Sequence, residues 1–111
     1  MPGEELIQVQ TAVASRVEGE RIGQAVVDAR LAACAQLVGP IKSRYRWQGE
    51  ATVSREWLLL LKARRADWDA LATEIRRLHS NEVPELIATP VLEVSPDYQA
   101  WVIEETQRTE G

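Results

Sequence analysis

Phenylalanine is absent from this 111-residue sequence, and histidine, cysteine and methionine each occur once. The only cysteine, Cys34, has no partner for an internal disulfide, and its apolar neighbours LAACAQLV predict a buried, unreactive thiol. A metal or redox role for Cys34 is the alternative. A tight copper or zinc site needs three or four ligands, and one chain offers few of the soft kind.

A long hydrophobic run is also absent. The longest uninterrupted apolar stretch, Trp57–Leu61, is far shorter than the roughly 20 residues of a membrane helix. The first residues, MPGEELIQ, lack the charged and apolar parts of a signal peptide. The net charge of -4 gives no general attraction to nucleic acid or anionic lipid. We therefore predict a cytoplasmic protein that binds neither nucleic acid nor a membrane.

The composition is typical of one folded domain. Hydrophobic residues make up 45% and charged residues 27% of the chain, which is the balance of a soluble globular protein. No linker or low-complexity segment divides the sequence. Residues 1–111 therefore form a single predicted domain.

The first half of the chain predicts a strand, a helix and a long hairpin. Residues 5–13 alternate as a strand does, and Ser15-Arg-Val-Glu18 fits a capping box, after which helical spacing continues to about residue 33. Residues 34–38 return to strand character, which Gly39-Pro40 breaks. Two further strands, at 41–48 and 51–64, are joined by the short connection QGEA.

The second half predicts a helix, an edge strand and a last helix. The helix covers about residues 66–79, with an apolar stripe and with charges that suit its dipole. Residues 86–94 form a strand that is at an edge or bulged, because Pro90 cannot donate to a ladder. Ser95-Pro96 is typical of the start of a final helix.

This order predicts an α+β, ferredoxin-like βαββαβ fold, with an antiparallel sheet, both helices on one face, a long central hairpin and an additional C-terminal helix. Outward side chains of the four consecutive leucines Leu58–Leu61 would then lie on an uncovered face, and contiguous apolar surface marks an interface. Burying two leucines contributes about 3 to 6 kcal/mol. We predict an obligate homo-oligomer in which the long hairpin pairs across subunits.

Motifs of several activities are missing. The chain has neither the RNP motif of RNA-recognition domains nor the CxxC pair of copper chaperones, and it has no phosphate loop, HExxH or Gly-x-Ser-x-Gly sequence. The fold itself assigns no function, since many activities share it.

Five motifs together resemble the CutA family of divalent-cation tolerance proteins: LAACAQL at 31–37, YRWQGE at 45–50, LLLLKAR at 58–64, EVPELIATPV at 82–91 and PDYQAWV at 96–102. The resemblance covers nearly the whole chain. It implies a tight homotrimer with inter-subunit sheets, a cytoplasmic location in bacteria, an association with copper and other divalent cations, and no established catalytic activity. We expect no obligatory cofactor, with copper or another divalent cation as the metal that could bind.

Within this resemblance, several positions depart from the family pattern. Ser80 and Asn81 replace a proline and a tyrosine in the loop after the second helix. Gln10 stands where some members have a cysteine linked to copper binding, Leu78 where such members have a second histidine, and Gln36 replaces a frequent asparagine. Each departure weakens the expectation of a copper site.

The candidate metal ligands are His79, Glu82 and Glu85, held around a cation in a cleft between subunits. The alternative for His79 is a structural role, with its ring stabilising the last carbonyls of the second helix. Lys62 either ends a solvated strand or lines the same cleft opposite Glu82 or Glu85. We expect the trimer contacts to come from the following aromatic and leucine side chains: Tyr45, Trp47, Trp57, Leu59, Leu61 and Trp101.

Three classes of function follow, in this order. The first is a trimeric divalent-cation tolerance protein that is not an enzyme and depends on His79 for cation binding. The second is a small-ligand-sensing or protein-interaction module, by analogy with trimers of the PII type. The third is an unrecognised enzyme, for which Glu82 beside Lys62 is the candidate pair.

Overall fold

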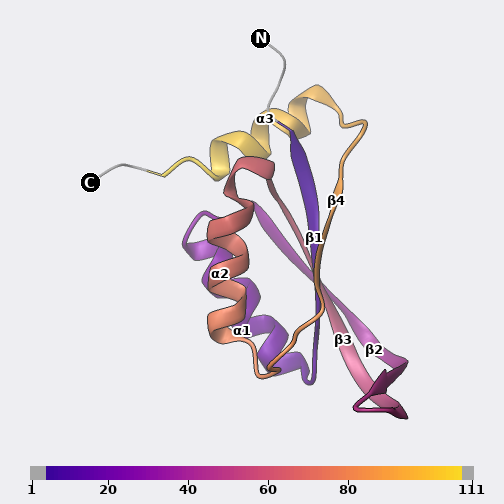
Figure 1. Cartoon of the computed structure of the whole chain (residues 1–111). Helices are drawn as coiled ribbons and strands as arrows, with labels where there is room; N and C mark the ends of the chain where they lie inside the picture. Colours follow the sequence, from indigo (N-terminus) through magenta and orange to yellow (C-terminus); the bar gives the residue numbers. More distant parts are fainter. Residues whose placement is uncertain (1–4, 109–111) are drawn as a thin grey trace.

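The computed structural model describes residues 5–108, which form four strands, three α-helices and one short 3-10 helix. Figure 1 shows the sheet with its long hairpin at one end and the last helix at the other. In chain order the elements are β1 (Leu6–Val13), α1 (Arg16–Asp28), β2 (Cys34–Trp47), β3 (Glu50–Arg64), η1 (Arg65–Asp67), α2 (Trp68–Leu78), β4 (Leu86–Pro90) and α3 (Pro96–Glu105).

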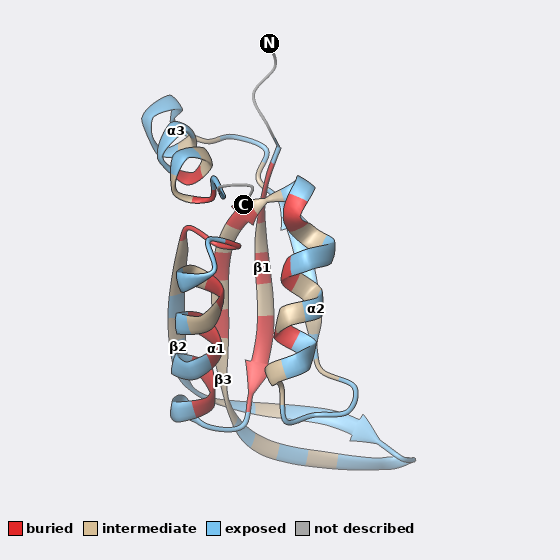
Figure 2. Ribbon diagram, turned by 90° about the vertical axis from the view of Figure 1, so that its left-hand side faces the viewer, coloured by how far each residue is buried: buried red, intermediate tan, exposed pale blue. Residues whose placement is uncertain are grey.

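The strands form one antiparallel sheet in the order β2-β3-β1-β4. Helices α1 and α2 lie on the same side of this sheet, and the buried residues gather between the two layers (Figure 2). The predicted α+β fold with an antiparallel sheet is therefore confirmed. The edge position predicted for the strand with Pro90 is also confirmed, because β4 is an outer strand and ends at that residue.

The main core lies on the helix side of the sheet. Val9 of β1 pairs with Leu61 of β3, and both are fully buried. They pack in one cluster with apolar residues of the two helices, among them Ile22 and Ile75. Consecutive strand residues point to opposite faces, so Leu58 and Leu60 occupy the other face, which these helices do not cover.

This geometry corrects the prediction for Leu59 and Leu61. Both side chains belong to the chain's own core, at 1% and 0% exposure, so they are not available for contacts with another subunit. The outward leucines are instead Leu58 and Leu60, which are half-buried.

Strand β2 is continuous, whereas the sequence predicted a break at Gly39-Pro40. Val38 pairs with Leu58 and Ile41 with Glu56, so β2 uses one residue more than β3 between these pairs. Such a bulge accommodates a proline, which has no N–H for the ladder, on this outer strand. The hairpin closes at Gln48 and Gly49, which both have positive φ, as a two-residue turn of type I′ requires.

Helix α1 begins where the capping box predicts and ends earlier than expected. Ser15 Oγ accepts from the Glu18 N–H at 3.1 Å, while Glu18 Oε1 accepts from the Ala14 N–H at 3.3 Å. The helix ends at Asp28 rather than near residue 33, since Arg30 takes a left-handed φ of 59°. Ala33 then donates its N–H to the Lys62 carbonyl and starts the pairing with β3.

Helix α3 covers only the end of the sheet remote from the hairpin (Figure 1). Val102 packs with Leu6 and Ala33 in a second, smaller cluster. Asp67 links the elements at this end, because its carboxylate forms ion pairs with Arg108 at 2.6 Å and with Arg64 at 3.1 Å.

Candidate functional site

The loop after α2 is held in place by His79, whose side chain is fully buried. Its Nε2 donates to the Ala12 carbonyl at 2.9 Å, and its Nδ1 accepts from the Asn81 N–H at 3.1 Å. The predicted contact of the ring with the last carbonyls of α2 is wrong, since the ring reaches β1 instead. Both ring nitrogens are used within the chain, so His79 has a structural role in this arrangement.

Glu18 binds the same loop from the start of α1. Its carboxylate accepts from the Ser80 N–H at 2.8 Å and from the Ser80 hydroxyl at 3.0 Å. Burial alone would raise the pKa of Glu18, but hydrogen bonds from Ser80 and Ala14 outweigh it and lower the pKa below its ordinary value. Ser80 thus fixes the loop through its backbone and its hydroxyl, whereas Asn81 contributes its backbone N–H.

Glu82 and Glu85 line a groove between this loop and the hairpin. The groove has a volume of about 720 Å³, and its walls include Tyr45, Trp47 and Glu56. Glu85, one of the candidate metal ligands, accepts a hydrogen bond from the Gln10 side chain at 2.6 Å. The structure brings the two candidate carboxylates to one groove, whereas the His79 ring faces Ala12.

Lys62 lies on the uncovered face of the sheet, directly opposite Cys34 on β2 and Gln8 on β1. Its Nζ donates to Gln36 Oε1 at 3.0 Å. Lys62 does not line the groove of Glu82 and Glu85, so the predicted pairing of Lys62 with either carboxylate is not found within residues 5–108.

Cys34 is half-buried, which corrects the prediction of a buried thiol. Its Sγ lies 3.7 Å from the Tyr98 hydroxyl of α3. Burial raises the pKa of Tyr98, and the contact with Cys34 adds to this effect, so the phenol stays protonated at neutral pH.

The aromatic candidates divide between the two faces. Tyr45, Trp47 and Trp101 keep 40 to 47% of their surface exposed, so they remain available for contacts with another molecule. Trp57 points to the helix side, where it packs against the main core and touches the position of Gly39. Its use as an interface residue is therefore limited to the part of the ring that stays exposed.

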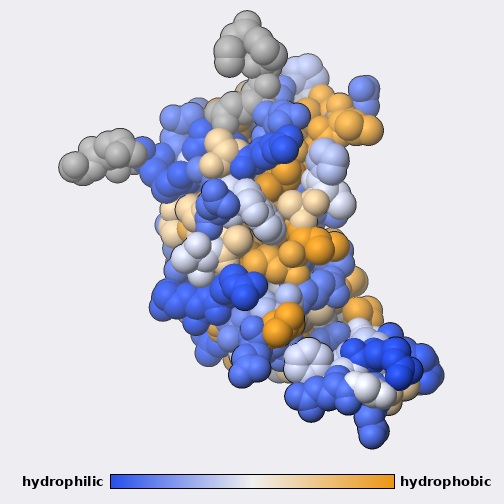
Figure 3. All heavy atoms as spheres, in the orientation of Figure 1, coloured by the Kyte–Doolittle hydropathy of each residue, from blue (hydrophilic) through white to orange (hydrophobic). Residues whose placement is uncertain are grey.

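We define the open face as the side of the sheet opposite α1 and α2. Four apolar residues that were not among the predicted trimer contacts lie on it, namely Val38, Leu58, Leu60 and Ile87. Alternate residues of a strand lie on the same face, and the charged Glu56 and Lys62 indicate that the even-numbered residues of β3 are the less buried set. This signal would have placed Leu58 and Leu60 on the open face. Figure 3 shows hydrophobic side chains gathered on the side where β4 runs, while the hairpin tip is mainly hydrophilic.

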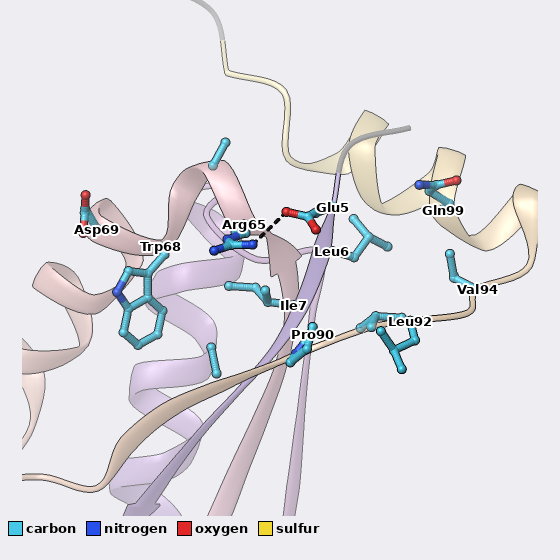
Figure 4. A pocket seen from close by; sticks show the side chains of 13 residues that line it. Glu5, Leu6, Ile7, Arg65, Trp68, Asp69, Pro90, Leu92, Val94 and Gln99 are labelled. Carbon is cyan, nitrogen blue, oxygen red and sulfur yellow. Dashed lines mark hydrogen bonds and ion pairs between the residues drawn. The ribbon is translucent and has the colours of Figure 1, made fainter. Parts of the chain in front are cut away.

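A second cavity, of about 690 Å³, lies at the end of the sheet near α3. Figure 4 shows its apolar wall of Leu6, Ile7, Pro90 and Leu92, with an ion pair of 2.8 Å between Glu5 and Arg65. None of the residues predicted to be functional lines it.

The comparisons with known proteins agree with this architecture. A family model described as CutA1 divalent ion tolerance protein matches residues 7–105. The chain is 38% identical over 98 residues to the divalent-cation tolerance protein CutA of Thermus thermophilus, which covers 88% of this chain and 95% of that protein. It is 32% identical over 103 residues to the chloroplastic protein CutA 1 of rice, covering 93% of this chain and 58% of the rice protein.

A solved structure gives the same result. The periplasmic divalent cation tolerance protein CutA from Archaeoglobus fulgidus superposes with a TM-score of 0.89 at 25% identity, over 92% of this chain and 99% of that one. An antiparallel four-stranded sheet with this helix arrangement and these matches defines a CutA-type domain. The chain belongs to the CutA1 divalent ion tolerance protein family.

The prediction of a cytoplasmic location is wrong, because members of this family are found in other compartments. The rice relative is named chloroplastic and the Archaeoglobus structure periplasmic, so membership does not fix the compartment. Within residues 5–108, no helix is long and apolar enough to cross a membrane.

The divalent cation that the family name implies does not fit the residues of one chain. Among the described residues, no group of three or more histidine, cysteine, aspartate or glutamate side chains is placed to hold a metal ion. His79 uses both ring nitrogens in hydrogen bonds, and Cys34 of β2 lies beside Tyr98 of α3. The carboxylates of the groove alone are hard ligands, which suit copper less than imidazole or thiolate does.

Proposed function

We propose that this chain serves in tolerance to divalent cations as a homotrimer and without catalysis, with its subunits joined through the open face of the sheet. The observation that carries the proposal is the row of apolar side chains on that face. Leu58 and Leu60 stand at its centre, and Val38 and Ile87 flank them with 47% and 49% of their surfaces exposed.

The hydrophobic effect favours covering this row. Each leucine or isoleucine that becomes fully buried contributes about 1.5 to 3 kcal/mol. Exposed contiguous patches of this kind mark interaction sites on soluble proteins. The outer strands β2 and β4 also leave unpaired backbone groups, which pairing between copies would satisfy.

Cation contact is assigned in this proposal to the groove carboxylates Glu82 and Glu85, completed by a second copy. Glu82 has no hydrogen-bond or ion-pair partner in residues 5–108, and it borders the exposed aromatic residues Tyr45 and Trp47. A groove closed by another subunit would bring carboxylates of two chains together. Such an oxygen-rich set binds copper or zinc weakly and without a role for the His79 ring.

Isothermal titration of the whole protein with copper and with zinc tests this assignment. We expect weak heats that are lost in Glu82→Gln/Glu85→Gln, and that persist in the matched control Glu20→Gln on the exposed side of α1. Unchanged heats in the double variant would contradict the assignment.

A second candidate, a small-ligand-sensing module, is supported by the size of the groove. Its volume of about 720 Å³ lies within the range of about 300 to 1,000 Å³ typical of small-molecule sites. Glu82, one of the pair considered for an enzyme, lines this groove, and Lys62 does not.

A further inference from the structure

Lys62 is a cation on the open face, near the end of β3 that lies by α3. It is half-buried, and its ammonium donates to the neutral Gln36 side chain at 3.0 Å. In residues 5–108 no carboxylate forms an ion pair with it. An ammonium group carries three N–H donors, so Gln36 leaves two without a protein partner.

The neighbours of Lys62 add further donors and no negative charge. Gln8 stands directly opposite on β1, and its side-chain amide has no hydrogen bond to the described part of the chain. Residues opposite one another on antiparallel strands have Cβ atoms about 5 Å apart. The Gln36 amide group, two residues along β2 from Cys34, can turn its NH2 toward the same place.

The carboxylate of Glu85 borders this region and is hydrogen-bonded to another side chain. Glu85 accepts from Gln10 at 2.6 Å, and Gln10 pairs with Leu60, two residues along β3 from Lys62. Successive residues on one side of a strand are about 7 Å apart. Within residues 5–108 the Glu85 carboxylate thus contacts a neutral amide and not the Lys62 ammonium.

Assembly through the open face would make this charge costly. A buried charge is stable only when it is paired and its hydrogen-bond donors are satisfied. Residues 5–108 of a single chain provide no carboxylate partner for Lys62 and one acceptor, Gln36. An anion with several acceptor oxygens would satisfy Lys62 and both amides at once.

We propose that Lys62, Gln8 and Gln36 bind a small anion that carries a carboxylate or phosphate group, in a cleft closed by a second copy of this chain. The inference rests on the proposed trimer and adds the ligand class to it. It differs from the cation groove, whose residues lie on the other side of Leu58 and Leu60 along the sheet.

The composition supplies a matched internal control, because the chain has two lysines. Lys42 is exposed on the helix side of the hairpin, opposite Arg55. Acetylation rates of both lysines in the whole protein can be followed by peptide mass spectrometry. The probes are citrate and inorganic phosphate, with sodium chloride at equal ionic strength as the reference.

At a probe concentration ten times its dissociation constant, acetylation of Lys62 should slow about tenfold, because only the free site reacts. The rate at Lys42 should not change. Protection by citrate alone identifies a carboxylate ligand, and protection by phosphate alone a phosphate ligand. The proposal is overturned if both lysines are protected equally, or if sodium chloride slows the acetylation of Lys62 as much as the probes do. It is also overturned if Lys62 reacts equally slowly in every buffer, because a partner's carboxylate would then pair with it.

Variants give an independent readout. The effective probe should raise the melting temperature of the wild type and of Lys42→Gln, and it should not raise that of Lys62→Gln. The mass of each sample by light scattering separates the two proposals. A trimer without protection of Lys62 overturns the anion site and leaves the assembly standing, whereas a monomer with protection overturns the assembly and the shared cleft.

Discussion

Glu18 Oε2 lies 3.7 Å from His79 Nδ1, and both side chains are buried where the start of α1 meets the loop after α2. The same carboxylate accepts two hydrogen bonds from Ser80, while the His79 ring donates to Ala12 at the end of β1. One cluster thus fixes a helix start, a strand end and the wall of the groove. The only histidine of the chain is a structural residue in this arrangement.

His79→Ala should lower the free energy of unfolding by about 2 to 4 kcal/mol, because it removes two hydrogen bonds and leaves a cavity and a buried carbonyl. Urea denaturation measures the change. The control Glu82→Gln, in the same loop and exposed, should stay within about 0.5 kcal/mol of the wild type. A fully stable His79→Ala protein that no longer binds copper would show that His79 is a ligand instead.

Glu18 should make stability depend on pH. Its folded-state pKa is lowered from 4.5, so its contribution is fully present above the unfolded pKa and is lost as the pH falls through the lower, folded value. Glu18→Gln should therefore be destabilised relative to the wild type at pH 7, and the difference should shrink below about pH 4.5. Exposed Glu20→Gln serves as the control on the same helix. A gap between Glu18→Gln and wild type that is constant with pH would refute the assigned role.

Asp67 joins η1 to the end of β3 and to the residues after α3. Its side chain is 8% exposed and binds Arg64 and Arg108. Asp67→Asn should lose about 2 to 3 kcal/mol, somewhat less than a fully buried pair, because Arg108 is partly exposed to solvent. Thermal unfolding compares it with Asp69→Asn, two residues away and exposed, which should melt near the wild-type temperature. Equal melting temperatures for the two variants would remove Asp67 from this role.

Thr11 carries a fully buried hydroxyl that has no hydrogen-bond partner among the described residues. Thr11→Val keeps the shape of the side chain and removes this unsatisfied group, so it should stabilise the fold by about 1 kcal/mol. Chemical denaturation with Thr73→Val on the exposed side of α2 as the control measures the gain. A loss of stability in Thr11→Val would mean that the hydroxyl does have a partner.

Most of the fold could be predicted because its signals are local. Ser15 and Glu18 mark a helix start, Pro90 marks an outer strand, and the alternation of residues 41–48 marks a strand. The orientation of Leu58–Leu61 is not visible in these four residues, since consecutive apolar residues do not alternate, and only the flanking Glu56 and Lys62 indicate it. It follows from pairing, as Val9 opposite Leu61 places the odd-numbered leucines under the helices.

The helix end and the site depended on distant contacts. Ala29 and Ala33 keep helical spacing, yet the Ala33 N–H binds the Lys62 carbonyl and belongs to the sheet. The sequence grouped His79 with Glu82 and Glu85 because they are close along the chain. The contact between the His79 ring and Ala12, far away in sequence, separates the ring from those carboxylates.

The direct test of the central claim is the mass of the protein in solution, measured by size-exclusion chromatography with light scattering at micromolar concentration. The wild type should give three times the chain mass of 12.5 kDa. Leu60→Asp, on the open face, should give a monomer, because it places a charge in the subunit contact. Val17→Asp, exposed on α1 behind the sheet, should remain trimeric. A monomeric wild type, or a trimer that survives Leu60→Asp, would contradict assembly through the open face.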